Sequence, residues 1–175
     1  MFKKIYKFIL RRFFSYKYAV KSGVNFKNMK TYGRIDWGSE PWIITIGNNV
    51  HLTDGIKFIT HDGGTLICRD KEPSLDITAP IIIGDNVYIG NNVILLPGVT
   101  IGDNVIIGAG AVVSKSIPSN SVAVGVPARV IESFEEYFEK AIQKSTKLGQ
   151  LKAKEKDLAL KKYFNYQGNK KGIYF

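Results

Sequence analysis

Residues 81–117, IIIGDNVYIGNNVILLPGVTIGDNVIIGAGAVVSKSI, carry an aliphatic residue at every sixth position. The first such row is Ile83, Ile89, Leu95, Ile101, Ile107 and Val113, and a second row four residues later is Val87, Val93, Val99, Val105, Ala111 and Ile117. A period of six matches neither a helix nor a strand with alternating faces. It predicts short strands joined by turns, three to a coil, with the aliphatic side chains stacked inside at the inter-strand spacing of about 4.8 Å. The predicted fold class is all-β, a parallel β-helix.

The turns of the repeat have their own composition. Glycine follows the aliphatic residue at Gly84, Gly90, Gly102 and Gly108, and pairs of Asp and Asn come next in most repeats. These residue types tolerate turn backbone better than others. The turns therefore support the same fold as the aliphatic rows.

The period also occurs earlier, at Ile46, Leu52 and Phe58. Ile46 and Ile83 are 37 residues apart, so the two blocks differ in phase by one residue and an interruption must separate them. Residues 60–80 are polar, contain the pair Gly63-Gly64 and lack the repeat. We expect a long loop here, and long loops in compact domains are usually functional.

The chain is expected to have three parts: a basic segment over residues 1–31, the β-helix over 32–131 with its loop at 60–80, and a helical, Lys-rich tail over 132–175. Phe2–Phe14 has the pattern of a basic amphipathic helix, which would either dock on the domain or make peripheral contact with a membrane. Ser133 and Glu136 form a capping-box pattern, and the apolar face of the helix they start could close the open end of the β-helix. Residues 150–164 suggest a second helix.

The charge distribution and the residue composition exclude several classes of function. The net charge is +10, and residues 1–35 hold ten Lys or Arg and no acid, whereas the middle of the chain is mildly acidic. Nucleic-acid binders more often spread basic charge over one folded face, so we expect no nucleic-acid partner.

With one cysteine, Cys68, and two histidines, a cysteine zinc site or a three-histidine metal site cannot be built, and no metal is expected. No apolar run could span a membrane, and Arg11 and Arg12 interrupt the apolar start, so the expected compartment is the cytoplasm.

Residues 81–131 resemble the hexapeptide-repeat acyltransferases, in particular the carboxy-terminal half of galactoside, maltose and serine acetyltransferases and the O-acetyltransferases of capsule and lipopolysaccharide. The resemblance implies left-handed coils, a homotrimer with active sites between neighbouring subunits, and direct transfer from acetyl-coenzyme A (acetyl-CoA) as co-substrate. The basic N-terminal segment and the tail after residue 145 do not belong to the common pattern.

His61 is the expected catalytic residue, because the family has a histidine at the start of the loop that leaves the β-helix. A neutral imidazole can remove the proton from an acceptor hydroxyl as it attacks a thioester carbonyl. A carboxylate or a backbone carbonyl should orient the other ring nitrogen, and Asp62, Asp54 and Glu72 are the candidate carboxylates. His51 is more simply a surface residue, and Cys68 an incidental thiol.

The resemblance also implies the residues that bind the coenzyme. These are Asn91 and Ala109 for the pantetheine arm, Ser114 and Lys115 near the nucleotide, and Arg129 near the phosphates. Coenzyme A is long and anionic, so it can lie along a flat face and meet cations at one end. Trp37, Asp36 and Glu40 are expected near the acceptor.

The expected function is O-acetylation of a sugar hydroxyl in surface-polysaccharide biosynthesis, with a carbohydrate acceptor. The alternatives are N-acetylation of an amino-sugar nucleotide, acetylation of another small molecule, and a non-catalytic trimeric scaffold. A β-helix carbonic anhydrase is excluded, because it needs three histidine ligands.

Overall fold

The computed structural model describes residues 5, 9–10, 13–166 and 168. The chain divides into two compact units, Met1–Tyr137 and Phe138–Phe175, and each is considered by itself. Most of the amphipathic helix expected over residues 2–14 lies outside the described residues.

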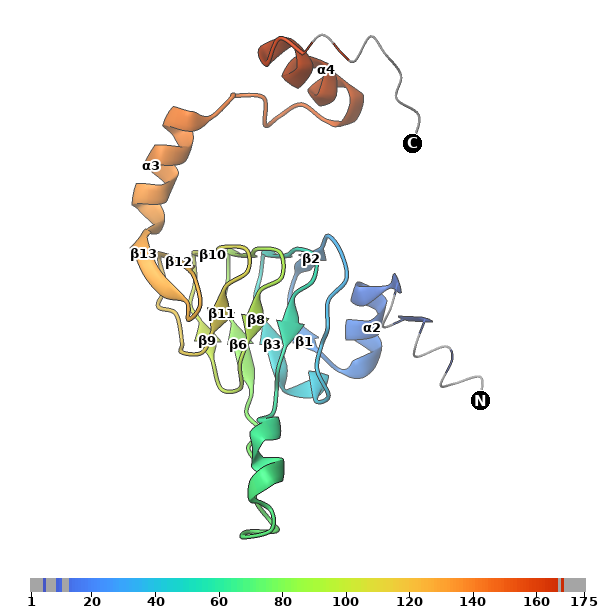
Figure 1. Ribbon diagram of the computed structural model, residues 1–175. Helices are drawn as coiled ribbons and strands as arrows, with labels where there is room; N and C mark the ends of the chain where they lie inside the picture. The colour runs from blue at the N-terminus through green and yellow to red at the C-terminus, as the bar shows by residue number, and fades with distance from the viewer. Residues whose placement is uncertain (1–4, 6–8, 11–12, 167, 169–175) are drawn as a thin grey trace. The chain divides into compact units, whose positions relative to one another are not determined.

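The first unit is a coil of short strands that form three sheets running along its length (Figure 1). The first sheet contains β1 (Asn25–Phe26), β3 (Ile44–Ile46), β6 (Ile81–Ile83) and β9 (Thr100–Ile101). The second contains β2 (Met29–Thr31), β4 (Val50–Leu52), β7 (Val87–Ile89), β10 (Val105–Ile107), β12 (Ser121–Val124) and β13 (Arg129–Ser133). The third contains β5 (Lys57–Phe58), β8 (Ile94–Leu95) and β11 (Val112–Val113). Within each sheet the strands are parallel, except that β13 is antiparallel to β12, so the predicted parallel β-helix is confirmed.

Both predicted aliphatic rows form the core. None of their side chains is more than 5% exposed. Ile46 lies beside Ile83 in the register, and Ile83 lies beside Ile101. Successive coils are therefore offset by 37 residues across the loop, by 18 after it and by 16 at the last coil. The extra residues of the longer offset form the loop at 60–80, which projects from the coil and contains the 3₁₀ helix η2 (Gly63–Cys68) (Figure 1).

The corner between the first and second sheets is held by a ladder of asparagines, which we call the asparagine corner: Asn49, Asn86, Asn104 and Asn120. Each of these residues has a left-handed φ of 53–57°. The side-chain amide of each one donates to the next, at N···O distances of 3.0, 3.1 and 2.9 Å. The glycines beside the ladder leave space for the carboxylates of the following coil, since a Cβ at Gly84 would lie 2.3 Å from the Asp103 Oδ1 atom. The repeated Gly-Asx pattern thus forms a continuous row of side-chain hydrogen bonds along this corner of the coil.

The coil begins earlier than predicted. Strands β1 and β2 pair in parallel with β3 and β4, so the β-helix starts at Asn25 and not at residue 32. Helix α2 (Ser15–Ser22) docks against this first coil: the Ser15 hydroxyl accepts the backbone N–H of Ile35 at 2.9 Å, and the indole of Trp37 donates to the Ser15 carbonyl at 3.1 Å. The basic segment is thus partly integrated into the fold.

At the C-terminal end of the coil the predicted helix forms, but it does not close the coil. The capping box is confirmed, because the Glu136 carboxylate accepts the Ser133 backbone N–H at 2.7 Å and the Ser133 hydroxyl accepts the Glu136 N–H at 3.1 Å. However, helix α3 (Phe134–Lys144) buries no residue, and the strand β13 covers β12 instead. The expected second helix is α4 (Ala153–Tyr163). None of the helices in the described part of the chain is long and apolar enough to cross a membrane.

Candidate active site

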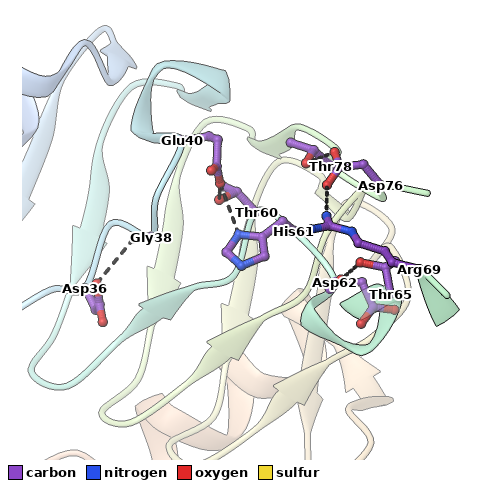
Figure 2. Close-up of polar contacts among 10 residues, drawn as sticks. All are labelled: Asp36, Gly38, Glu40, Thr60, His61, Asp62, Thr65, Arg69, Asp76 and Thr78. Carbon is purple, nitrogen blue, oxygen red and sulfur yellow. Dashed lines mark hydrogen bonds and ion pairs between the residues drawn. The ribbon is translucent and has the colours of Figure 1, made fainter. Parts of the chain in front are cut away.

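His61 lies at the neck of the projecting loop, where the chain leaves the third sheet after β5. The two sides of the neck pair with each other: the Asp62 N–H donates to the Ile77 carbonyl at 2.8 Å, and the Ala79 N–H donates to the Thr60 carbonyl at 3.0 Å. Further out, the Arg69 guanidinium lies 3.6 Å from the Asp76 carboxylate (Figure 2). The loop is therefore anchored at its base, and the anchoring fixes the backbone of His61.

The Glu40 carboxylate holds the imidazole of His61. Its Oε2 atom lies 3.2 Å from His61 Nδ1 and accepts the Thr60 hydroxyl at 2.6 Å (Figure 2). An ionised carboxylate can only accept hydrogen bonds, so Nδ1 carries the ring proton and Nε2 keeps its lone pair. The His61 side chain is 44% exposed and that of Glu40 is 25% exposed. The pair thus presents a basic nitrogen at an accessible edge of the coil.

Glu40 reaches His61 because it occupies the matching place in the preceding coil. Asp36 pairs with Lys57, and Glu40 and His61 have the same separation of 21 residues. Between them, Gly38 has a φ of +70°, and a Cβ there would lie 2.6 Å from the Phe58 carbonyl oxygen. This close approach brings the segment before the 3₁₀ helix η1 (Pro41–Ile43) against Thr60 and His61.

The carboxylates expected to orient His61 have other partners, so that expectation was wrong. Asp62 accepts the Gly64 N–H at 2.8 Å, and Asp54 accepts the Arg34 N–H at 2.6 Å. Glu72 accepts hydrogen bonds from the hydroxyl and the backbone N–H of Ser74, which lower the pKa of its carboxyl. Glu40, which the sequence placed near the acceptor, is the orienting carboxylate.

Two of the expected coenzyme residues stack on one corner, between the second and third sheets. We call this row the Asn91 column: Asp54, Asn91 and Ala109 in successive coils. The Asn91 side chain accepts the Asp54 N–H at 3.1 Å, and its carbonyl accepts the Gly110 N–H at 2.8 Å. All three residues are exposed. The column is a narrow polar edge that an extended molecule could follow.

Of the other expected coenzyme residues, Ser114 and Lys115 lie at a different corner, whereas Arg129 lies in the second sheet, beside Val124. Ser114 and Lys115 follow β11 at the corner that also carries His61, and both are exposed. Arg129 opens β13, where one of its guanidinium nitrogens donates to the Ala128 carbonyl at 2.9 Å. The width of the third sheet, roughly 15 Å for five extended residues, separates this corner from the Asn91 column. Within one chain, therefore, His61 and the Asn91 column do not face each other.

Of the remaining candidates, His51 and Trp37 make structural contacts. His51 accepts the Tyr32 hydroxyl at 2.7 Å on Nδ1 and bonds Asn49 at 3.1 Å through Nε2, which joins it to the asparagine corner. Trp37, expected near the acceptor, is fully buried and stacks on Phe58 with ring centroids 5.0 Å apart. Asp36 accepts the Gly38 N–H at 3.3 Å. Cys68 is exposed on the loop. Among the described residues, no group of three or more His, Cys, Asp or Glu side chains is placed to hold a metal ion.

Comparison with known proteins identifies the family. The model of the bacterial transferase hexapeptide family (six repeats) matches residues 80–115. Protein CapG of Staphylococcus aureus is 44% identical over 161 residues, which are 90% of this chain and 94% of that protein. A maltose O-acetyltransferase from Clostridium difficile 630 is 30% identical, with a TM-score of 0.56 over 74% of this chain and 83% of that one. The chain belongs to the hexapeptide-repeat acetyltransferase family.

This family membership makes the protein an acyltransferase with the left-handed parallel β-helix fold. Galactoside O-acetyltransferase of Escherichia coli K12 is 38% identical over 119 residues, which are 68% of this chain. The same alignment spans 56% of that relative. The resemblance inferred from residues 81–131 is thus confirmed.

Proposed function

We propose that this acetyltransferase moves the acetyl group of acetyl-CoA to a sugar hydroxyl during the biosynthesis of a surface polysaccharide. The observation that carries the proposal is the Glu40–His61 pair, which presents His61 Nε2 at the neck of the loop. Two relatives support a sugar acceptor, since they are named as O-acetyltransferases of galactosides and of maltose.

The chemistry follows from the pair. His61 Nε2 takes the hydroxyl proton while the acceptor oxygen attacks the thioester carbonyl, and a C–O bond forms. The C–S bond then breaks, and the thiolate of coenzyme A leaves with the proton held by the imidazolium. Glu40 fixes the Nδ1–H tautomer and offsets the positive charge that develops on the ring. General-base help of this kind accelerates a reaction by roughly 10²–10⁴.

The coenzyme would lie along the Asn91 column, with its phosphates near cations. Because His61, Ser114 and Lys115 lie across the third sheet from Asn91 and Ala109, one site needs both corners and takes them from two copies of the chain. A homotrimer supplies three such sites by closed symmetry. The flanks of the coil suit this assembly: Ile82 and Tyr88, in the middle of β6 and β7, are 42% and 45% exposed.

Arg129 and Lys115 are the cations proposed for the coenzyme's phosphates. Loss of either charge, as in Lys115→Ala or Arg129→Ala, is expected to raise the KM for acetyl-CoA more than it lowers kcat. The reaction is proposed to take place in the cytoplasm, at the inner face of the cell membrane.

The test is release of free thiol from acetyl-CoA in the presence of a panel of acceptors. The panel includes galactosides, maltose, oligosaccharides, amino sugars and amino-sugar nucleotides. We expect release with hydroxyl acceptors and a product that hydroxylamine cleaves, as it cleaves esters. Release only with amino acceptors, and a product that resists hydroxylamine, would show N-acetylation instead. Absence of coenzyme binding would indicate the non-catalytic scaffold.

A further inference from the structure

Helix α2 has two different faces. Its inner face, Ser15, Tyr18 and Ala19, is buried against the first coil. With 3.6 residues per turn, Tyr16 and Val20 fall away from this inner face, and Lys17 and Lys21 lie next to them. Tyr16 and Val20 are 44% and 55% exposed. An outer face that combines apolar side chains with lysines is typical of helices that lie in a membrane interface.

The surroundings of α2 extend this face. A cavity of 540 Å³ opens beside the start of the helix and is lined by aromatic residues, by Lys17 and by Arg34. Trp42, 62% exposed, lies at the other end of the helix, where its Cβ is 3.4 Å from the position of a Cβ on Gly23. Aromatic side chains are favoured at the level of lipid headgroups.

The charge of the N-terminal sequence indicates which partner this surface binds. Residues 1–35 contain ten Lys or Arg and no acid. Lys17, Lys21, Lys27, Lys30 and Arg34 are all exposed. Such a surface is complementary to an anionic bilayer, and each cation near it strengthens binding roughly fivefold at moderate salt.

We infer that the outer face of α2, together with Trp42 and the cavity beside Lys17 and Arg34, is a docking surface for an anionic phospholipid bilayer. The cavity takes a headgroup phosphate between the two cations, and Val20, Tyr16 and Trp42 enter the interface. The surface is at the end of the coil, so copies packed side by side along the flanks leave it free. In the proposed homotrimer, three such surfaces would lie on the same side of the assembly and would bind the bilayer together.

Vesicle co-sedimentation of the full chain tests this inference. Vesicles of phosphatidylcholine with phosphatidylglycerol should bind the protein, pure phosphatidylcholine should not, and salt should weaken binding. Lys17→Gln/Lys21→Gln should weaken binding roughly 25-fold. The matched control, Lys154→Gln/Lys162→Gln on α4, removes the same charge from two exposed sites and should leave binding unchanged.

The apolar contribution has its own matched pair. Val20→Ser should weaken binding, whereas Leu158→Ser on α4 should not, although Leu158 is equally exposed at 57%. Because Trp37 is fully buried, Trp42 reports contact, and its fluorescence should shift to the blue on binding. Equal losses in the two lysine pairs, or binding without the shift, would mean general electrostatic attraction and overturn the inference. Thiol release with a soluble acceptor does not depend on this surface, so it tests the proposed function separately.

Discussion

The asparagine corner and the corner that carries His61 belong to the same coil, yet they differ in structure and in chemistry. At the asparagine corner four successive coils each supply an asparagine with φ near 55°, and each amide bonds the next. At the His61 corner a long loop interrupts the repeat, and a histidine and a carboxylate from successive coils bond each other. At the first corner the asparagine side chains bond one another, whereas at the second Glu40 engages Nδ1 of His61 and leaves Nε2 to act on a substrate. The regular asparagine ladder stabilises the coil, and the loop that interrupts the repeat positions the side chains for catalysis.

The largest effect is expected from the two histidines: His51, which lies in β4 and bonds the asparagine corner, and His61 at the other corner. His61→Asn should lower kcat by roughly 10²–10⁴, because the general base is lost, while the melting temperature stays unchanged. His51→Asn is the matched control and should retain activity, since His51 bonds Tyr32 and Asn49. Thiol release measures both variants. A loss of activity in His51→Asn but not in His61→Asn would reverse the roles of the two corners.

The next effect concerns the glycines. Gly84→Ala should destabilise the fold by roughly 2–3 kcal/mol, because the new Cβ would meet the Asp103 carboxylate and the Gly102 backbone. Gly63→Ala, in the loop of the other corner, places its Cβ where no heavy atom lies within 4 Å and should cost little. Thermal unfolding of the two variants gives the comparison. Equal melting temperatures would show that the tight stacking beside the ladder is not required.

Much of this comparison could be predicted from the sequence. The period of six identified the fold and both buried rows, and the separation of 37 residues between Ile46 and Ile83 located the loop and, through the resemblance, His61. The orienting carboxylate could not be predicted in this way, because residues 32–40 lack the regular repeat and their register was unknown. The separation of 21 between Asp36 and Lys57 would have placed Glu40 beside His61.

The ends of the coil were also less predictable. Strands β1 and β2 are two and three residues long and carry no repeat, so nothing in the sequence marked residue 25 as the start. Helix α2 was missed because two of its three buried residues, Ser15 and Ala19, are polar or small, so the helix shows no clear apolar stripe. These elements depend on tertiary contacts, which override local pattern.

A moderate effect is expected from Glu40. Glu40→Gln keeps the size of the side chain but removes the charge that orients the imidazole and stabilises its protonated form. We expect kcat to fall roughly 10- to 100-fold, which is about 1.4–2.7 kcal/mol, with the KM for acetyl-CoA unchanged. Glu72→Gln is the same substitution on the loop, where the carboxylate bonds Ser74, and should have no effect on kcat. Equal activity of the two variants would exclude Glu40 as the positioning residue.

The smallest effect separates the two contributions that Asn86 makes to the asparagine corner. Asn86 accepts from Asn49 and donates to Asn104, and its φ of 56° is strained for most residues. Asn86→Ala loses both bonds and also takes up an unfavourable left-handed conformation, so it should destabilise by roughly 1–2 kcal/mol. Asn86→Gly loses the same bonds but adopts this φ freely, so it should be about 1 kcal/mol less destabilising in denaturant unfolding. If the glycine variant is as stable as the natural protein, the ladder bonds contribute nothing and only the turn conformation matters. If the two variants are equally destabilised, the bonds carry the whole effect, and the corner is held by its side chains and not by its backbone.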